Sequence, residues 1–211
     1  TDVLTYNLEL SSRPSFKKRV KSFKSYYKKI LRLKSEEAVS AKSLICLSDM
    51  MGIRVICPFL EDIDVAVEQV KNAFLVVEVE RKGADKSFRE FGYESVHVLV
   101  KIPENCMPEL TGKYKDLAPL PNDAVCEIQI RTILQDAWAE VEHELIYKTE
   151  FTPLDIPLRR KLASLNASLS LADITFQEIR DYQNRLQREI SERRNSFYAI
   201  ADNLTEELST A

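Results

Sequence analysis

Glycine and histidine are scarce in this chain, and long apolar runs are missing. Four glycines occur among 211 residues, at positions 52, 83, 92 and 112. Because glycine supplies the backbone freedom of tight turns, we expect turns in the first half and helices in the second. No stretch is long and apolar enough to span a bilayer, and the polar start TDVLTYNLEL does not resemble a signal peptide. A membrane partner is therefore not expected.

Cysteine is also rare, and its spacing argues against a metal centre. The four cysteines, at 46, 57, 106 and 126, form no CxxC pair, and His97 and His143 are the two histidines. We therefore expect reduced core thiols in a cytoplasmic protein rather than a zinc site. A net charge of −3 gives no global positive field that would attract nucleic acid.

The spacing of apolar residues predicts a mixed sheet flanked by helices, an α/β (α+β) fold. Proline at position 14 and apolar residues at helical spacing predict a first helix over 14–34. A second helix is expected over 62–74, with Asp62 near its start, and a third after Arg131. The expected strands are 51–59, 75–81, 94–102 and 124–130.

From Leu158 onward the pattern changes to a heptad seam. Apolar residues follow a four-three spacing from position 158 to 204, interrupted at Gln183 and Arg193, without glycine or proline. This pattern predicts long helices that either fold back as a hairpin on the first part or pair with another subunit as a homo-oligomer.

The segment 13–34 contains ten lysines and arginines and no acidic residue. Such a run is usually a solvated face, but cations without counter-charges repel one another, and an anionic ligand would relieve that repulsion. Arg19, Lys21, Ser25 and Lys29 form the pattern R-x-K-x-x-x-S-x-x-x-K. These residues are candidates for holding a polyphosphate.

The strand around EIQIR has an unusual polar face. In an extended chain Glu127, Gln129 and Arg131 lie on one face, while apolar residues lie on the other. A half-solvated strand would explain the alternation. An acceptor, an amide and a permanent cation just before a helix also suit a functional site.

Two further segments carry polar residues at strand positions. SDMMGIRV places Asp49 before a strand and Arg54 within it, and an aspartate there is commonly a turn residue. FGYESVH places Tyr93 and His97 on one strand face, beside a basic loop that includes Arg89. Aromatic and histidine side chains in strands are usually structural, but these could equally stack on a base and contact its phosphates.

Taken in order, these motifs resemble the synthetase domain of RelA/SpoT-type alarmone synthetases. The segments are R-x-K-x-x-x-S-x-x-x-K, D-x-x-G-I-R-V, G-Y-x-S-x-H, E-I-Q-I-R-T and A-W-A-E-x-E-H-x-x-x-Y-K, between about residues 15 and 150. The resemblance implies a nucleotidyltransferase-like synthetase fold with about five strands over residues 1–152, and a helical extension over 153–211. It also implies an ATP:GTP 3′-diphosphotransferase that moves the β,γ-diphosphate of Mg-ATP to the ribose 3′-hydroxyl of GDP or GTP.

The resemblance assigns roles to the matching positions. Arg19 and Arg54 would enclose the adenine of ATP, while three neighbours hold its phosphates: Lys21, Ser25 and Lys29. Asp49 would hold Mg²⁺, and Glu127 would assist the metal and act as the base on the 3′-hydroxyl. Phosphoryl-type transfer needs such cations, a hard-oxygen metal site and an aligned nucleophile.

On the acceptor side, Tyr93 would stack on guanine, with His97 and Gln129 near its ribose and phosphates and Arg89 in the adjoining basic loop. Asp136 differs from the Asn or His that relatives often carry near the guanine. A carboxylate matches guanine's N1 and N2 donors, so we expect Asp136 to read the acceptor base.

Two other functions stay open at this stage. Neither histidine precedes an aspartate, so the chain resembles a synthesis-only enzyme without the family's metal-dependent hydrolase. The loop ADKSFREFGY is similar to relatives that act as toxins by pyrophosphorylating the 3′ end of tRNA. The heptad tail also fits an inactive nucleotide-sensing or oligomerisation module, although the presence of Asp49, Tyr93 and Glu127 argues against inactivity.

Overall fold

The computed structural model describes residues 10, 12–22, 24–25, 27, 31, 50–83, 94–103, 124–147 and 156–209. Within them, five strands form one mixed sheet in the order β1-β2-β5-β4-β3. The β2–β5 pair is parallel, and the other neighbouring pairs are antiparallel. The strands are β1 Ser15–Val20, β2 Met51–Cys57, β3 Val76–Lys82, β4 Ser95–Lys101 and β5 Val125–Thr132.

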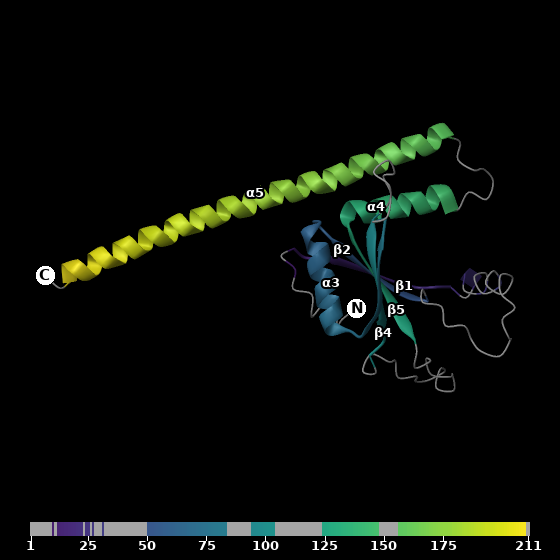
Figure 1. Ribbon diagram of the computed structural model, residues 1–211, viewed down its shortest axis with the longest axis horizontal. Coiled ribbons are helices and arrows are strands. Elements are labelled where there is room, and N and C mark those ends of the chain that lie inside the picture. Colours follow the sequence, from purple (N-terminus) through teal and green to yellow (C-terminus); the bar gives the residue numbers. More distant parts are fainter. Residues whose placement is uncertain are drawn as a thin grey trace.

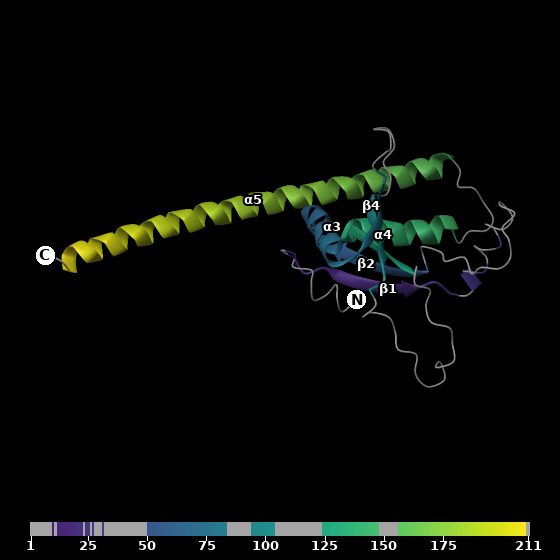
Figure 2. The same ribbon diagram turned by 60° about the horizontal axis from the view of Figure 1, so that its bottom comes forward.

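Three long helices accompany the sheet (Figure 1) among the described residues. They are α3 Glu61–Ala73, α4 Ile133–Glu142, which continues into a π-helical turn at His143–Tyr147, and α5 Ile156–Ser209. In Figures 1 and 2, α4 lies between α5 and the sheet. The expected mixed sheet with flanking helices and a long C-terminal helix is confirmed.

The apolar face of the sheet forms the core together with α3. Val55, Ile128 and Ile130 are buried on this face, and Ala66 and Val70 of α3 pack against it. Alternation along the strands sends every second side chain to the opposite face, which α3 leaves uncovered. The core therefore fixes the sheet and leaves one polar face available for a site.

The described cysteines belong to this core. Cys57 and Cys126 are free thiols. Burial, together with the charge of Asp62, raises the pKa of Cys57 to about 12. Burial also raises the pKa of Cys126, to about 11. Both are thus protonated at neutral pH, as expected for core thiols rather than nucleophiles.

The prediction of a continuous helix over 14–34 was wrong in its first part. Residues Ser15–Val20 form the edge strand β1, which pairs with β2. Helical structure begins later, and Ser22 caps its start, because the Ser25 backbone N–H donates to Ser22 Oγ at 3.3 Å. The Lys21 backbone N–H instead donates to the Met50 carbonyl at 2.9 Å, which keeps Lys21 beside β2.

Thr132 links β5, α4 and α5 at one buried point. Its side chain accepts from the Gln135 backbone N–H at 3.0 Å, and Gln135 Oε1 accepts from the Thr132 backbone N–H at 2.9 Å. This reciprocal capping box starts α4 immediately after β5. The Thr132 hydroxyl also donates to Asp173 Oδ2 on α5 at 2.6 Å. Burial raises the pKa of Asp173, although this hydrogen bond opposes the increase.

The heptad segment forms one continuous helix, α5, so the hairpin alternative was wrong for the described residues. Its first half is anchored to the domain by Arg180. The Arg180 Nε atom lies 2.6 Å from Glu61 Oε1, and its guanidinium lies 4.1 Å from the centre of the Phe59 ring. Beyond Arg180, α5 extends away from the sheet (Figure 1).

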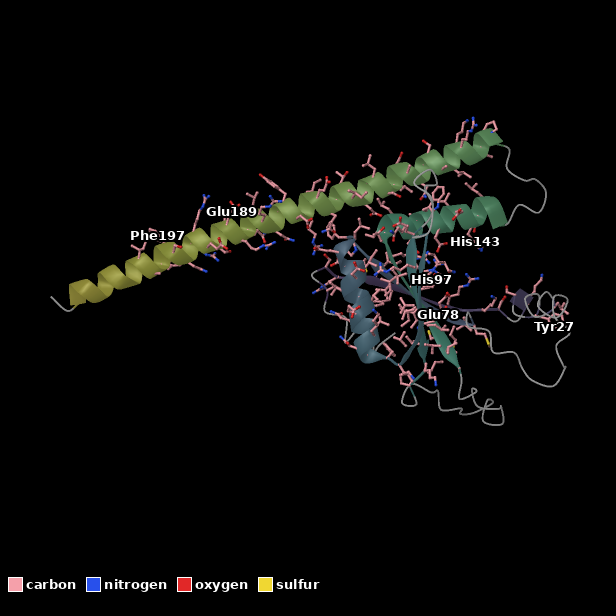
Figure 3. All side chains as sticks on the ribbon, viewed as in Figure 1. Tyr27, Glu78, His97, His143, Glu189 and Phe197 are labelled. Atoms are coloured by element: carbon pink, nitrogen blue, oxygen red, sulfur yellow. The ribbon has the colours of Figure 1, made fainter. Side chains whose placement is uncertain are left out.

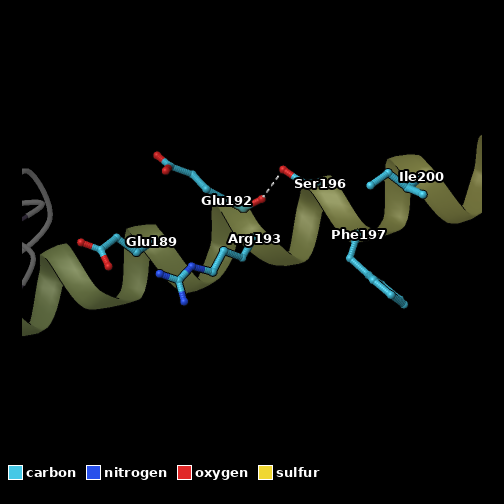
Figure 4. Close-up of a pocket in the computed structure, with 6 residues that line it drawn as sticks. All are labelled: Glu189, Glu192, Arg193, Ser196, Phe197 and Ile200. Atoms are coloured by element: carbon cyan, nitrogen blue, oxygen red, sulfur yellow. Dashed lines mark hydrogen bonds between the residues drawn. The ribbon is translucent and has the colours of Figure 1, made fainter.

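The C-terminal half of α5 carries an exposed apolar stripe. Ile190 is 62% exposed and Phe197 is 68% exposed. Figure 4 shows that the hollow at this point is lined by side chains from one stretch of the same helix, so it is a surface feature rather than a cavity. Among the helices described, none combines the length and apolar character needed to cross a membrane.

Candidate active site

The polar face of the sheet aligns charged side chains in rows across the strands. Residues in register share a face. Two neighbouring rows cross β1, β2, β5 and β4 in that order, and their members are Arg19, Gly52, Glu127, Leu99 in one and Lys17, Arg54, Gln129, His97 in the other. The rows bring five residues predicted from the sequence onto one surface, from the four segments 14–34, 51–59, 94–102 and 124–130.

Glu127 is held from both sides. His97 Nδ1 lies 2.7 Å from Glu127 Oε1, and Gln129 Nε2 donates to Glu127 Oε2 at 2.8 Å. Burial by itself would raise the pKa of Glu127, but the hydrogen bonds from His97 and Gln129 outweigh it and lower the pKa. Glu127 is therefore an ionised, oriented carboxylate at neutral pH. The position of its partner His97 in the sheet is marked in Figure 3.

Arg131 extends this chain of contacts toward α4. Its guanidinium donates to Gln129 Oε1, so the amide of Gln129 is fixed with its NH₂ group toward Glu127. Arg131 is itself buried, and its Nη1 lies 3.6 Å from Asp136 Oδ1. The alternation seen in EIQIR thus orders a series of groups that ends on the carboxylate of Glu127.

Arg19 and Arg54 are diagonal neighbours on adjacent strands. Arg19 is in register with Gly52, and Arg54 with Lys17. Diagonal neighbours in an antiparallel pair lie about 7–8 Å apart, a separation that admits one flat ring between two guanidinium groups. The missing side chain at Gly52 leaves the surface between Arg19 and Glu127 clear. The enclosure of adenine by both arginines stays a prediction.

Asp136 has partners that the sequence analysis did not predict. It is 4% exposed, and Lys17 Nζ lies 2.6 Å from its Oδ2, while Arg54 Nη1 lies 3.3 Å from its Oδ1. Arg54 Nη1 also donates to Glu140 Oε1. Both oxygens of Asp136 are thus occupied by cations, which leaves the carboxylate poorly placed to receive the donors of a guanine.

Sequence reasoning placed Arg131 on the polar face of its strand but missed Lys17 and Glu140 as members of this network. Lys17 was missed because the segment was predicted to be a helix. In the observed strand, residues two positions apart share a face, so Lys17 lies on the same face as Arg19. Glu140 follows Asp136 by one helical turn, a spacing visible in the sequence. No local signal tied either of them to Arg54.

Four predicted site residues, Asp49, Lys29, Arg89 and Tyr93, lie outside the described residues, so their placement stays a prediction. Ser25 is described, and its hydroxyl lies 3.0 Å from that of Ser22.

The fit of a magnesium ion rests on Glu127. No group of three or more metal-binding side chains gathers within the part of the chain that the structure describes. Mg²⁺, however, usually takes one or two carboxylates and completes its shell with water and substrate phosphates. Each oxygen of Glu127 engages one donor, from His97 or Gln129, and has a further lone pair for a hard cation. The residue present therefore fits the ion.

Comparison with known proteins places the chain in a family. The model of the region found in RelA/SpoT proteins matches residues 18–152, and the chain belongs to this family. It is homologous to two proteins of Bacillus subtilis (strain 168). GTP pyrophosphokinase YwaC is 34% identical over 145 residues, 68% of this chain and 63% of that protein. GTP pyrophosphokinase YjbM is 30% identical over 142 residues, 66% of this chain and 61% of that protein. The alignments thus span less than two thirds of either relative.

Solved structures show the same fold. The small alarmone synthetase 1 from Bacillus subtilis superposes with a TM-score of 0.61 at 26% identity, covering 81% of this chain and 80% of that chain. The same protein bound to its product pppGpp gives 0.60 at 26% identity, over 79% of this chain and 78% of that chain. The structure of that protein bound to AMPCPP superposes with a TM-score of 0.55 at 25% identity, covering 81% of this chain and 78% of that chain.

Proposed function

We propose that the chain is a GTP/GDP pyrophosphokinase, which transfers the β,γ-diphosphate of Mg-ATP to the ribose 3′-hydroxyl of GDP or GTP. The observation that carries the proposal is the placement of Glu127. Glu127 belongs to the row that begins at Arg19, and its carboxylate is held by His97 and Gln129 of the adjoining row. An oriented base beside cations is what diphosphate transfer to a hydroxyl requires.

In this mechanism Glu127 takes the proton of the 3′-hydroxyl. The 3′-oxygen then forms a bond to the β-phosphorus of ATP, and the bond from that phosphorus to the α,β-bridging oxygen breaks, so AMP leaves. The lowered pKa of Glu127 keeps it ionised and ready to accept the proton at neutral pH. Its two hydrogen-bond donors hold the receiving oxygen in place, which reduces the ordering needed at the moment of reaction.

The donor nucleotide would lie against β1 and β2. Arg19 and Arg54 enclose the adenine, and Lys21, Ser25 and Lys29 contact the phosphates. Asp49 and Glu127 would hold Mg²⁺, which supplies charge neutralisation to the phosphate oxygens when bound. The structure of a relative, small alarmone synthetase 1 from Bacillus subtilis, with the ATP analogue AMPCPP supports a nucleotide donor.

The acceptor would lie toward β4. His97 Nε2 is buried and has no hydrogen-bond partner within the described part of the chain, which is a costly state for a polar atom. With Nδ1 donating to Glu127, Nε2 is the accepting nitrogen of a neutral imidazole, and a ribose hydroxyl of the acceptor would satisfy it. Tyr93 would supply the stacking surface and Arg89 a phosphate contact, and the relative's structure with pppGpp supports a guanine nucleotide.

Transfer of label from γ-labelled ATP tests the proposal. The full chain is incubated with Mg²⁺ and GDP, GTP or tRNA, and the products are separated. We expect label on GDP or GTP. Label on tRNA alone would establish the toxin-type reaction, and AMPCPP binding without any transfer would establish an inactive nucleotide-sensing module.

A further inference from the structure

Two acidic residues on α4 lie over the basic strands β1 and β2. Asp136 and Glu140 are one helical turn apart, and together we call them the acidic clasp. Lys17 Nζ lies 2.6 Å from Asp136 Oδ2 and 3.9 Å from Glu140 Oε1. Arg54 Nη1 lies 3.3 Å from Asp136 Oδ1 and donates to Glu140 Oε1. The acidic clasp therefore joins α4 to both strands that carry the donor-side cations.

The two acids of the clasp differ in burial. Asp136 is almost completely buried, whereas the side chain of Glu140 is 53% exposed. A buried carboxylate needs compensating cations, and here Lys17, Arg54 and Arg131 supply them. Asp136 is consequently the inner, fixed member, and Glu140 is the outer member at the surface.

The clasp holds Arg54 in a way that leaves its flat surfaces usable. Both contacts to the acidic clasp are made by Nη1, at one edge of the guanidinium. A planar cation fixed by its edge still presents two faces for stacking on a ring. Arg19 lies diagonally opposite on β1, so the plane of Arg54 determines the slot between the two arginines.

We propose that Asp136 and Glu140 are positioning residues that order Arg54 and Lys17 for the donor nucleotide. This inference rests on the proposed function, because it assumes that ATP binds against β1 and β2. It replaces the sequence-based expectation that Asp136 reads the acceptor guanine. Ordering a long side chain before binding removes that entropic cost from the binding step.

The test separates donor binding from acceptor choice in the full chain. Asp136→Asn, Glu140→Gln and Arg54→Ala are compared for affinity to AMPCPP by calorimetry and for the kcat/KM ratio of GDP to IDP, which lacks the guanine N2 amine. We expect Asp136→Asn to weaken AMPCPP binding about tenfold, as for loss of one buried charged hydrogen bond. Glu140→Gln, at an exposed pair, should weaken it about two- to fivefold. The GDP to IDP ratio should not change.

A double-mutant cycle distinguishes positioning from a general loss of structure. If Asp136 acts through Arg54, adding Asp136→Asn to Arg54→Ala should cost little further affinity for AMPCPP. Glu68→Gln, in an exposed pair with Lys71 on α3, removes a charge elsewhere and should change neither readout. Should Asp136→Asn fail to fold, Glu140→Gln carries the same cycle at the surface.

Three results would overturn the inference. One is a changed GDP to IDP ratio in Asp136→Asn with AMPCPP affinity intact. Another is additive loss in the cycle with Arg54→Ala. The third is failure of the unmodified chain to bind AMPCPP, which would also remove the donor half of the proposed function. Clasp-dependent AMPCPP binding without diphosphate transfer would instead support the clasp while contradicting the proposed activity.

Discussion

His97 Nδ1 lies 2.7 Å from Glu127 Oε1, and the two residues belong to adjacent antiparallel strands, β4 and β5. They are not directly in register, because His97 pairs with Gln129. The contact is therefore diagonal, and Gln129 reaches the other oxygen of the same carboxylate. A single carboxylate is thus oriented by both neighbours in the adjoining row.

Glu127→Gln should nearly abolish diphosphate transfer, because an amide cannot accept the hydroxyl proton. We expect kcat to fall about 10²–10⁴-fold, the usual contribution of a positioned base. Labelled ATP and GDP give the rate, and circular dichroism checks the fold. Glu78→Gln is the matched control. Glu78 on β3 pairs with Leu99, which pairs with Glu127, so it is a carboxylate in the same row at the opposite edge of the sheet (Figure 3). Near-normal turnover in Glu127→Gln would exclude the mechanism.

His97 should be replaceable in part by asparagine. His97→Ala removes the donor to Glu127 Oε1, and we expect kcat to fall about tenfold, the cost of one charged hydrogen bond. His97→Asn keeps an N–H donor near the position of Nδ1 and should recover part of that loss. Steady-state kinetics of the two variants decide the point, and equal losses would contradict an orienting role for the donor.

Arg19→Ala should weaken the use of ATP more than the use of GDP. The guanidinium is one wall of the proposed adenine slot, and stacking on a base contributes about 1–3 kcal/mol. KM for each substrate is measured with the other saturating. Lys18→Ala is the control, because alternation places Lys18 on the opposite face of the same strand. If both variants leave KM for ATP unchanged, the cluster is a solvated surface.

Arg180→Ala should destabilise the protein by about 3–5 kcal/mol, the cost of leaving a buried charge without its partner. The residue left behind is Asp62, which is 1% exposed and lies 3.6 Å from Arg180 Nη1. Urea unfolding measures the change. Arg188→Ala, further along α5, should cost less than about 0.5 kcal/mol because surface substitutions seldom cost more. Similar losses in the two variants would show that Arg180 is not the anchor of α5.

Substitutions in the apolar stripe of α5 should prevent self-association. We expect the full chain to form a homo-oligomer through this helix, because an exposed apolar stripe of this length marks an interaction surface. Ile190→Glu combined with Phe197→Glu should reduce the mass measured by light scattering. Arg194→Glu, next to the heptad seam, is the control. A monomeric unmodified chain would contradict the expectation.

Local sequence determined most elements of the fold. Period-two alternation predicted β2, β3, β4 and β5, and helical spacing predicted α3, α4 and the long α5. The exception was β1, where Phe16 and Val20 are four residues apart and suit a helix equally well. Segment 15–20 is a strand because it pairs with β2 at the edge of the sheet. This pairing is a long-range contact, which the spacing of apolar residues within the segment cannot reveal.

The candidate site, like the fold, was determined partly by local sequence and partly by tertiary structure. The sequence by itself determined the residue types, because alternation in EIQIR places Glu127 and Gln129 on one face whatever the strand pairs with. Tertiary structure decided which groups meet. Asp136 contacts Lys17, 119 positions away in the sequence, and this contact exists because β1, β2 and the start of α4 converge. Strand register and helix docking are set by long-range packing, so the partners of Asp136 follow from the assembled core and not from its neighbours in the chain.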